Sequence, residues 1–168
     1  MLDICTIGDE VLREKSEEVK VFDDALKMLV DAMFETLDEA DGVGLAGCQV
    51  GAPSRLFIVS IKDENIRSVF INPQIIETSY ETGPYEEGCL SLPGEYFKVV
   101  RPLEVTVQAQ DVKGKPFTVR AKGLLARVIQ HEYDHLDGMM FIDRLSEADR
   151  EKVLARYNKN SKKRGRRK

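Results

Sequence analysis

The sequence holds few of the features that mark secreted or membrane-bound proteins. Its 168 residues include only three cysteines, Cys5, Cys48 and Cys89, and no two of them form a CxxC pair. An odd and scattered set argues against a disulfide framework and suits a reducing compartment. No apolar run approaches the length of a membrane span. The N-terminal stretch MLDICTIGDE is acidic and too polar for a signal peptide, so we expect a cytoplasmic protein with no membrane contact.

A dinucleotide-binding loop is also missing, although one stretch is rich in glycine. The stretch GVGLAGCQVG, residues 42–51, contains four glycines. Its first six residues, GVGLAG, have the GxGxxG spacing, but they follow a predicted helix, whereas a dinucleotide loop follows a strand and opens a helix. The stretch is then either a turn or one wall of a binding site.

What the sequence does contain is an ordinary globular composition with an uneven distribution of charge. The hydrophobic share is 42% and the charged share 32%, and this length suits one domain with its own core. Residues 156–168 hold eight Lys or Arg and no acid, so the net charge of −4 leaves −12 on residues 1–155. We predict one domain at 1–155 and a disordered basic tail at 156–168. The tail either contacts nucleic acid, such as the ribosome, or is simply a solvated end.

Hydrophobic periodicity predicts an α+β fold. Helices are expected at residues 23–41, at 122–136, and from 146 into the tail. Strands are expected at 56–61 and 69–71, followed by a hairpin of 105–109 and 116–120 that turns at Gly114. We therefore predict a single domain of short, mostly antiparallel strands around the second helix, with an N-terminal and a C-terminal helix beside them.

The only two histidines lie in the segment QHEYDHLDG. His131 and His135 are four residues apart, so on a helix both imidazoles lie on one face and can bind one metal ion. Glu132 stands beside that face, where it can hold a metal-bound water. Leu124 and Val128 extend the same face toward the N-terminus, which predicts that the histidines are buried and need partners. The spacing leaves the third ligand open between a downstream carboxylate and a cysteine.

Three segments together resemble the signature motifs of one enzyme family. They are GVGLAGCQ at 42–49, EGCLS at 87–91 and QHEYDHLDG at 130–138. Their sequence and order are similar to the three motifs of peptide deformylases, and the resemblance covers nearly all of the chain before the basic tail. It implies a metal-dependent hydrolase that removes the formyl group from the N-terminal methionine of nascent polypeptides and releases formate.

The resemblance also implies which residues carry the chemistry. Cys89, His131 and His135 would hold one divalent metal ion, with water in the fourth position. The ion is expected to be Fe(II), with Zn, Ni or Co also compatible with thiolate and imidazole ligands. Glu132 would be the general base and acid. The side-chain amide of Gln49 and the backbone N–H of Leu90 would hold the oxyanion, while Cys48 is interpreted as a packing residue.

Substrate-binding residues follow from the same resemblance. The expected set is Val43, Gly44, Gly88, Leu124 and Val128. Val43, Leu124 and Val128 would form an apolar slot for methionine, and Gly44 would offer backbone hydrogen bonds to an extended peptide. Four further residues lie near the motifs without a settled role: Tyr96, Arg127, Gln130 and Asp134.

Two other functions remain open from the residues alone. A zinc endopeptidase would also use the HExxH helix, but it would take its third ligand from a residue downstream of that helix. A non-catalytic protein that binds the ribosome or RNA would act through the basic tail. We expect the protein to be a monomer.

Overall fold

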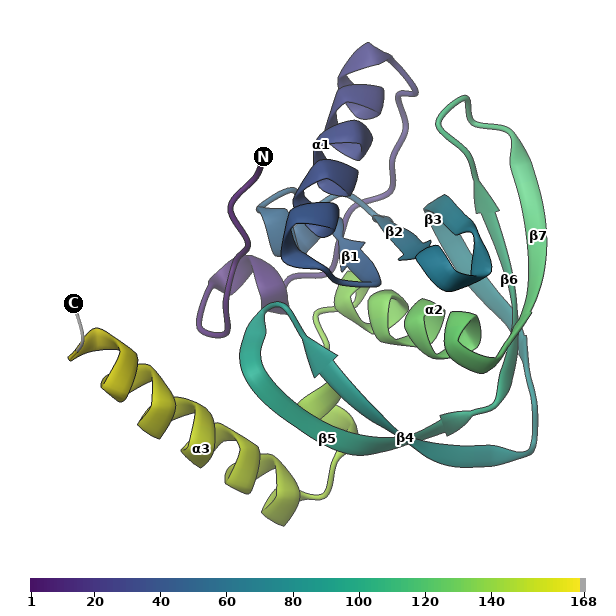
Figure 1. The fold of residues 1–168 in the computed structure, drawn as a ribbon. Coiled ribbons are helices and arrows are strands. Elements are labelled where there is room, and N and C mark those ends of the chain that lie inside the picture. The colour runs from purple at the N-terminus through teal and green to yellow at the C-terminus, as the bar shows by residue number, and fades with distance from the viewer. Residues whose placement is uncertain (167–168) are drawn as a thin grey trace.

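The fold places one helix between two separate antiparallel sheets (Figure 1). A computed structural model describes residues 1–166. Its helices are α1 (Asp24–Ala40), α2 (Gly123–Leu136) and α3 (Glu147–Gly165), with four short 3-10 helices at Glu10–Arg13, Gly47–Val50, Lys62–Glu64 and Phe141–Arg144. Its strands are β1 (Gly44–Ala46), β2 (Leu56–Ile61), β3 (Ile66–Thr78), β4 (Thr82–Cys89), β5 (Leu92–Pro102), β6 (Glu104–Gln110) and β7 (Pro116–Lys122).

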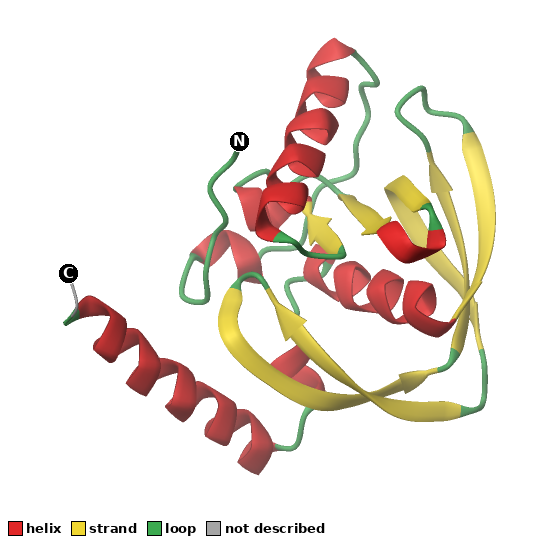
Figure 2. Ribbon diagram, in the orientation of Figure 1, coloured by secondary structure: helices red, strands yellow, loops and turns green. Residues whose placement is uncertain are grey.

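The larger sheet has the strand order β1-β2-β3-β6-β7, and β4 pairs with β5 in a sheet of two strands (Figure 2). All pairs within both sheets are antiparallel. The predicted hairpin is confirmed as β6 and β7, and its turn contains Gly114 at φ 80°. The predicted strand at 69–71 is part of the longer β3. The α+β fold class is confirmed, while β4 and β5 were not predicted.

Helix α1 forms where the spacing of its apolar residues predicts a helix. The side chain of Asp23 accepts a hydrogen bond from the backbone N–H of Leu26 at 3.0 Å, which caps the first turn. The buried face presents Val30, Met33 and Leu37 to strand β2 and its neighbours. The helix ends at Ala40 and is followed by its C-cap Asp41, whose φ of 53° lies in the left-handed region.

Helix α2 is the buried centre of the molecule. It packs against the larger sheet through a cluster that includes Val128 and Ile129. Gly138 follows its last turn at φ 74°, and a Cβ there would lie 2.5 Å from the backbone oxygen of Arg13. Only glycine fits this close approach. The end of α2 is therefore set against the N-terminal segment, which fixes the helix along its axis.

The prediction of a disordered basic tail is wrong for residues 156–165, because α3 continues through them. Ser146 caps the helix by accepting from the backbone N–H of Asp149 at 3.2 Å. Val153 is fully buried, and Arg156 pairs with Glu95 at 3.2 Å. Acids in the first turn and bases in the last turn match the helix dipole. Residues 167 and 168 of the predicted tail lie outside the described residues.

Within residues 1–166, no helix combines the length and the apolar composition that crossing a membrane requires.

Candidate metal centre

Three side chains with metal-ligating atoms meet at one point beside α2. Cys89 ends β4, and His131 and His135 lie one turn apart on α2. Their ligand atoms all lie within 4.8 Å of one another, and Cys89 Sγ is 3.4 Å from His135 Nε2. The cluster takes its third donor from Cys89, upstream of the helix, and not from a downstream carboxylate as the endopeptidase alternative requires. The predicted ligand set is therefore brought together.

The donors in this cluster fit a divalent ion of intermediate softness. Burial, together with the neighbouring His131, holds the pKa of His135 well below its usual value, so this imidazole is neutral and able to ligate. Burial also disfavours charge on His131, but hydrogen bonds to Cys89 and Glu87 raise its pKa well above the usual value. The surroundings of His131 therefore favour a positive charge at this point of the cluster. One thiolate with two imidazoles suits Zn or Fe(II).

A buried carboxylate fixes the orientation of the first histidine. His131 Nδ1 lies 2.8 Å from Oε1 of Glu87, so its Nε2 faces the cluster, 3.9 Å from Oε1 of Glu132. Burial opposes ionisation of Glu87, yet the hydrogen bonds from His131 and Arg101 lower its pKa to about 2. A carboxylate behind a ligating imidazole selects one tautomer and strengthens the ligand.

Two buried arginines hold this carboxylate in place. Arg101 donates to Glu87 through Nε at 2.7 Å and through Nη2 at 3.0 Å, and its Nη1 donates to Asp134 at 2.9 Å. Arg127 donates to Glu87 at 3.1 Å and to the backbone oxygens of Val99 and Gly83. Every charge in this network has a partner of opposite sign.

Sequence reasoning missed the role of Glu87 and Arg101, and it left Asp134 open between a supporting role and the helix surface. Asp134 is buried and also accepts from Arg144 at 2.7 Å, which settles that question. Gln130 donates to the backbone oxygens of Pro102 and Ala126 and supports the fold. A signal for Glu87 existed: residues two apart on a strand share a face, and Glu87 stands two before Cys89.

Glu132 lies beside the ligand cluster with one oxygen unsatisfied. Its side chain is buried, and Oε2 finds no hydrogen-bond partner among residues 1–166. Burial raises the pKa of Glu132 to about 7, although the charge of His131 opposes the rise. A Cβ added to Gly44 would lie 2.9 Å from Oε1 of Glu132 and 2.7 Å from a methyl group of Val128. The glycine at position 44 therefore leaves room for this carboxylate.

Gln49 is fixed with its amide nitrogen toward the cluster. Its Oε1 accepts from the backbone N–H of Ala46 at 2.9 Å. Its Nε2 then lies 3.0 Å from Ser91 Oγ and 3.5 Å from Cys89 Sγ. The neighbouring thiol of Cys48 is fully buried, and burial raises its pKa to about 12, which agrees with a packing residue.

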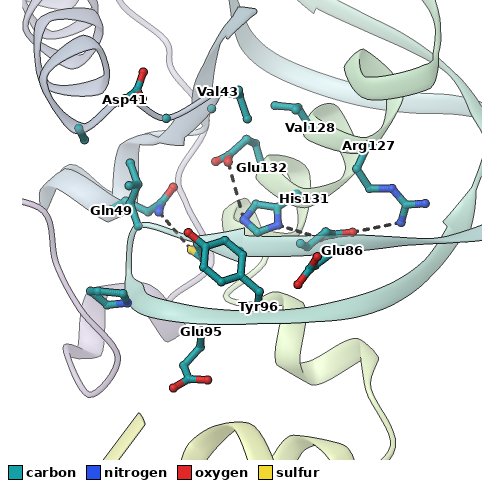
Figure 3. Close-up of a pocket in the computed structure, with 18 of the residues that line it drawn as sticks. Asp41, Val43, Gln49, Glu86, Glu95, Tyr96, Arg127, Val128, His131 and Glu132 are labelled. Atoms are coloured by element: carbon teal, nitrogen blue, oxygen red, sulfur yellow. Dashed lines mark hydrogen bonds and ion pairs between the residues drawn. The ribbon is translucent and has the colours of Figure 1, made fainter. Parts of the chain in front are cut away.

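A cleft of about 400 Å³ opens over the cluster (Figure 3). Its lining includes Gln49, Leu90 and Glu132. It also includes all five predicted substrate-binding residues, which are Val43, Gly44, Gly88, Leu124 and Val128. Gly88 stands opposite Tyr96 in the β4–β5 register, and a Cβ at Gly88 would lie 2.4 Å from the tyrosine ring. The ring of Tyr96 therefore lies across Gly88 at the cleft.

An HExxH helix, a thiol and two imidazoles at the floor of this cleft place the chain among the metallohydrolases. The sequence model of one family, polypeptide deformylase, matches residues 1–151. The peptide deformylase of Chromobacterium violaceum is 48% identical over 163 residues, which cover 96% of this chain and 97% of that protein. The peptide deformylase of Treponema pallidum is 47% identical over 156 residues, which cover 93% of this chain and 95% of that protein.

Solved structures agree with the sequence comparison. The crystal structure of a peptide deformylase from Legionella pneumophila superposes with a TM-score of 0.93 at 40% identity, covering 99% of this chain and 98% of that one. The peptide deformylase from Ehrlichia chaffeensis in complex with actinonin has a TM-score of 0.91 at 38% identity, with 95% and 97% covered.

The chain belongs to the polypeptide deformylase family. The predicted enzyme class, a metallohydrolase, and the predicted peptide deformylase activity are confirmed.

Proposed function

We propose that the enzyme removes the formyl group from the N-terminal methionine of nascent polypeptides, with formate and a free amine as products. The main support for the roles of the residues is the position of Glu132. This buried carboxylate lies beside the cluster of metal-ligating side chains, and one of its oxygens has no hydrogen-bond partner within residues 1–166. A buried acid with a pKa of about 7 can both accept and return a proton near neutral pH.

Cys89, His131 and His135 would hold one divalent ion. Such an ion supplies Lewis acidity and brings the pKa of a bound water to about 7. The donor set accepts Fe(II), Zn, Ni and Co, and we infer Fe(II) in the cell, as the family resemblance implies.

The protein groups then divide the remaining chemistry between them. Glu132 accepts the proton of the attacking water at its carboxylate and delivers it to the nitrogen of the leaving amine. Gln49 donates from Nε2, and Leu90 donates from its backbone N–H, to the oxygen of the formyl carbonyl as negative charge develops there. The bond from Ala46 to Gln49 Oε1 supports this role, because it keeps Nε2 directed at the cluster.

The cleft supports binding of methionine followed by an extended chain. Val43, Leu124 and Val128 line it with apolar surface suited to a methionine side chain. Strand β1 lies at the edge of its sheet, so the backbone around Gly44 can pair with an extended peptide on its unpaired side. A side chain at Gly88 would displace the Tyr96 ring, which supports a role for this glycine in shaping the cleft.

Localisation and partners are inferred from the remaining features. Cys5, Cys48 and Cys89 are free thiols, as expected in the reducing cytoplasm. The exposed bases Lys159, Lys162 and Lys163 on α3 supply the positive charge for contact with the ribosome, where formylated chains emerge. We propose that the enzyme acts as a monomer.

The test is release of formate from a formyl-Met peptide by enzyme purified without oxygen. We expect release by the wild type and a loss of at least about 10²-fold in kcat for Glu132→Gln, with bound metal retained. Glu35→Gln, an exposed change on α1, is the matched control. Absence of formate release by the metal-loaded wild type would overturn the proposal.

A further inference from the structure

One wall of the substrate cleft is made by a stretch of chain that its own sheet does not hold. Residues 93–96 of strand β5 line the cleft, and we call them the β5 wall. In the register of β4 and β5, Leu92 and Tyr96 pair with consecutive residues of β4. Residues 93–95 between them have no partner among the residues of β4, as in a β-bulge. The ladder of hydrogen bonds therefore does not fix the position of this wall.

Gly94 adds to the conformational freedom of the β5 wall. Its φ of 81° lies in the region that favours glycine. Apart from its neighbours in the chain, the nearest atom that a Cβ there would meet is Nη2 of Arg164, at 3.9 Å. Glycine restricts its own backbone less than any other residue. The position of the wall then depends on contacts from outside the sheet.

Helix α3 supplies such a contact through Arg156. Neighbouring side chains on a strand point to opposite faces, and Figure 3 shows Tyr96 over the cleft and Glu95 pointing away from His131. Nε of Arg156 lies 3.2 Å from Oε2 of Glu95. The side chain of Glu95 is 4% exposed and that of Arg156 is 54% exposed. The acid of the wall is thus the buried partner, and the helix brings the base to it.

Burial of the acid makes the wall depend on this ion pair. Arg156 is the one ion-pair partner that Glu95 has within residues 1–166. A buried carboxylate without a partner is unfavourable, because it has lost its water and gained no opposite charge. Without Arg156, the carboxylate of Glu95 has to turn toward solvent. The backbone of the wall then moves with it, because Gly94 allows the change.

Helix α3 is held firmly enough to act as a support. Val153 is fully buried in the cluster that contains Phe141. Two turns beyond Arg156, Nη2 of Arg164 donates to the backbone oxygen of Pro93 at 3.4 Å. Residues eight apart lie on the same face of a helix, so both arginines meet the wall from one side. The second contact is long and exposed, so Arg156 carries the larger share.

The β5 wall and the reacting groups belong to different elements. The ring of Tyr96 lies across Gly88 at the cleft, so a displaced wall changes the shape of the surface that substrate meets. The ligand Cys89 ends β4, and Glu132 lies on α2. A change in the wall is therefore expected to affect the binding of substrate more than the chemical step.

We propose that the ion pair between Arg156 and Glu95 positions the β5 wall, so that helix α3 sets the affinity of the cleft for its substrate. Both are positioning residues, because they act through the wall and not on the reacting atoms. The inference rests on the proposed function, since it concerns substrate binding in the same reaction. An interaction that is equally strong with the bound substrate and with the transition state changes KM and leaves kcat unchanged.

The first experiment measures kcat and KM of the metal-loaded enzyme for formyl-Met-Ala-Ala-Ala. We expect Arg156→Ala to raise KM by about three- to tenfold and to change kcat by less than about twofold. Arg156→Lys keeps the charge and should bring KM back to within about twofold of the wild type. Lys152→Ala is the matched control, because it breaks an exposed ion pair with Asp149 on the same helix. Its KM should equal that of the wild type.

A double-mutant cycle tests whether the two residues act as one unit. Glu95→Gln alone should raise KM as Arg156→Ala does, and the double variant should raise it little further. A loss of stability alone gives a different result, because a smaller folded fraction lowers the apparent kcat and leaves KM unchanged. Additive effects of the two changes on KM would contradict the pairing.

A spectroscopic measurement follows the wall directly. The sequence contains no tryptophan, so Tyr96→Trp places a single indole on the wall. In this background, Arg156→Ala is expected to lower the fluorescence anisotropy of the indole, and Lys152→Ala is expected to leave it unchanged. Equal anisotropy with and without Arg156 would contradict a positioning role.

The kinetic outcomes separate the two proposals. A KM of Arg156→Ala equal to that of the wild type, or a fall in kcat at unchanged KM, overturns the inference about the wall. Failure of the metal-loaded wild type to release formate from the peptide overturns the proposed function instead.

Discussion

Glu87 shows how much of the site depends on a residue that does not touch the metal position. Its carboxylate accepts a hydrogen bond from His131 and is fixed by Arg101 at 2.7 Å. It is buried, and its pKa of about 2 keeps it ionised across the pH range of the cell. The negative charge behind His131 makes the imidazole a better donor to a cation.

We expect Glu87→Gln to weaken metal binding by about 10–100-fold, because an amide holds His131 without the charge. The measurement is metal retention in competition with a chelator of known affinity. Glu86→Gln is the matched control, since Glu86 is exposed and alternates to the other face of β4. Equal metal affinity in wild type and Glu87→Gln, with both variants folded by circular dichroism, would contradict this role.

Residue-level prediction from sequence succeeded where the chemistry is local in the chain. His131, Glu132 and His135 share one helical segment, so their spacing predicts that they meet. Cys89 and Gln49 lie far from them in sequence and were assigned by resemblance to family motifs. Arg101 could not be predicted, because its contact with Glu87 depends on the pairing of β4 and β5, and no hairpin was expected there.

Among the helices and strands, those with a clear pattern of apolar residues could be predicted from the sequence. Helix α1 buries residues at a helical period and strand β2 buries all six of its residues, and both were expected near their observed bounds. Strands β4 and β5 contain Gly83, Pro84, Gly88 and Gly94, and glycine and proline are depleted in strands. In β4, Gly88 makes room for the ring of Tyr96. The same glycine therefore weakens the strand signal in the sequence and shapes the site in the structure.

The start of helix α3 could be predicted from the capping residue Ser146 and the acidic residues after it, but the contacts that order its basic half could not be read from composition. Its inner half packs Val153, Leu154 and Tyr157 against the cluster that contains Phe141. Its outer half is exposed and basic. The two halves therefore have different expected roles, the first in stability and the second in contact with a polyanion.

Two truncations separate these roles. A chain that ends at Lys159 keeps the inner half, so its melting temperature and its activity on a short formyl-peptide should change little, while salt-dependent ribosome binding weakens. A chain that ends at Lys152 loses Val153 and the partner of Glu95, and we expect a fall of roughly 5–10 °C in melting temperature. Calorimetry and sedimentation with ribosomes measure the two effects. Equal melting temperatures for both truncations would contradict the stabilising role of the inner half of α3.

For the molecule as a whole, one ion cluster joins the N-terminal segment to the C-terminal helix. Asp143 pairs with Arg13 and with Arg150 at 3.3 Å, and accepts from the backbone N–H of Met140 at 2.9 Å. Burial opposes ionisation of Asp143, but the bonds from Met140 and Arg13 outweigh it and lower the pKa. A lowered folded-state pKa adds stability above the unfolded value, and this stability is lost as pH falls through the folded value.

We therefore expect Asp143→Asn to destabilise the protein by about 1–2 kcal/mol at pH 7, discounted for the partial exposure of both arginines. The difference between variant and wild type should narrow below about pH 4, where the unfolded aspartate becomes protonated. Urea unfolding across this pH range measures it. A difference that stays constant down to about pH 2 would show that the charge of Asp143 contributes nothing.

The division of the ligands between two parts of the fold has one more consequence. Cys89 comes from the two-stranded sheet, while His135 comes from α2, 46 residues later in the chain. An ion bound to both acts as a reversible cross-link that closes this long loop. Loss of the ion then removes one of the links between the β4–β5 sheet and α2, so oxidation of the Cys89 thiol removes a tether as well as a ligand.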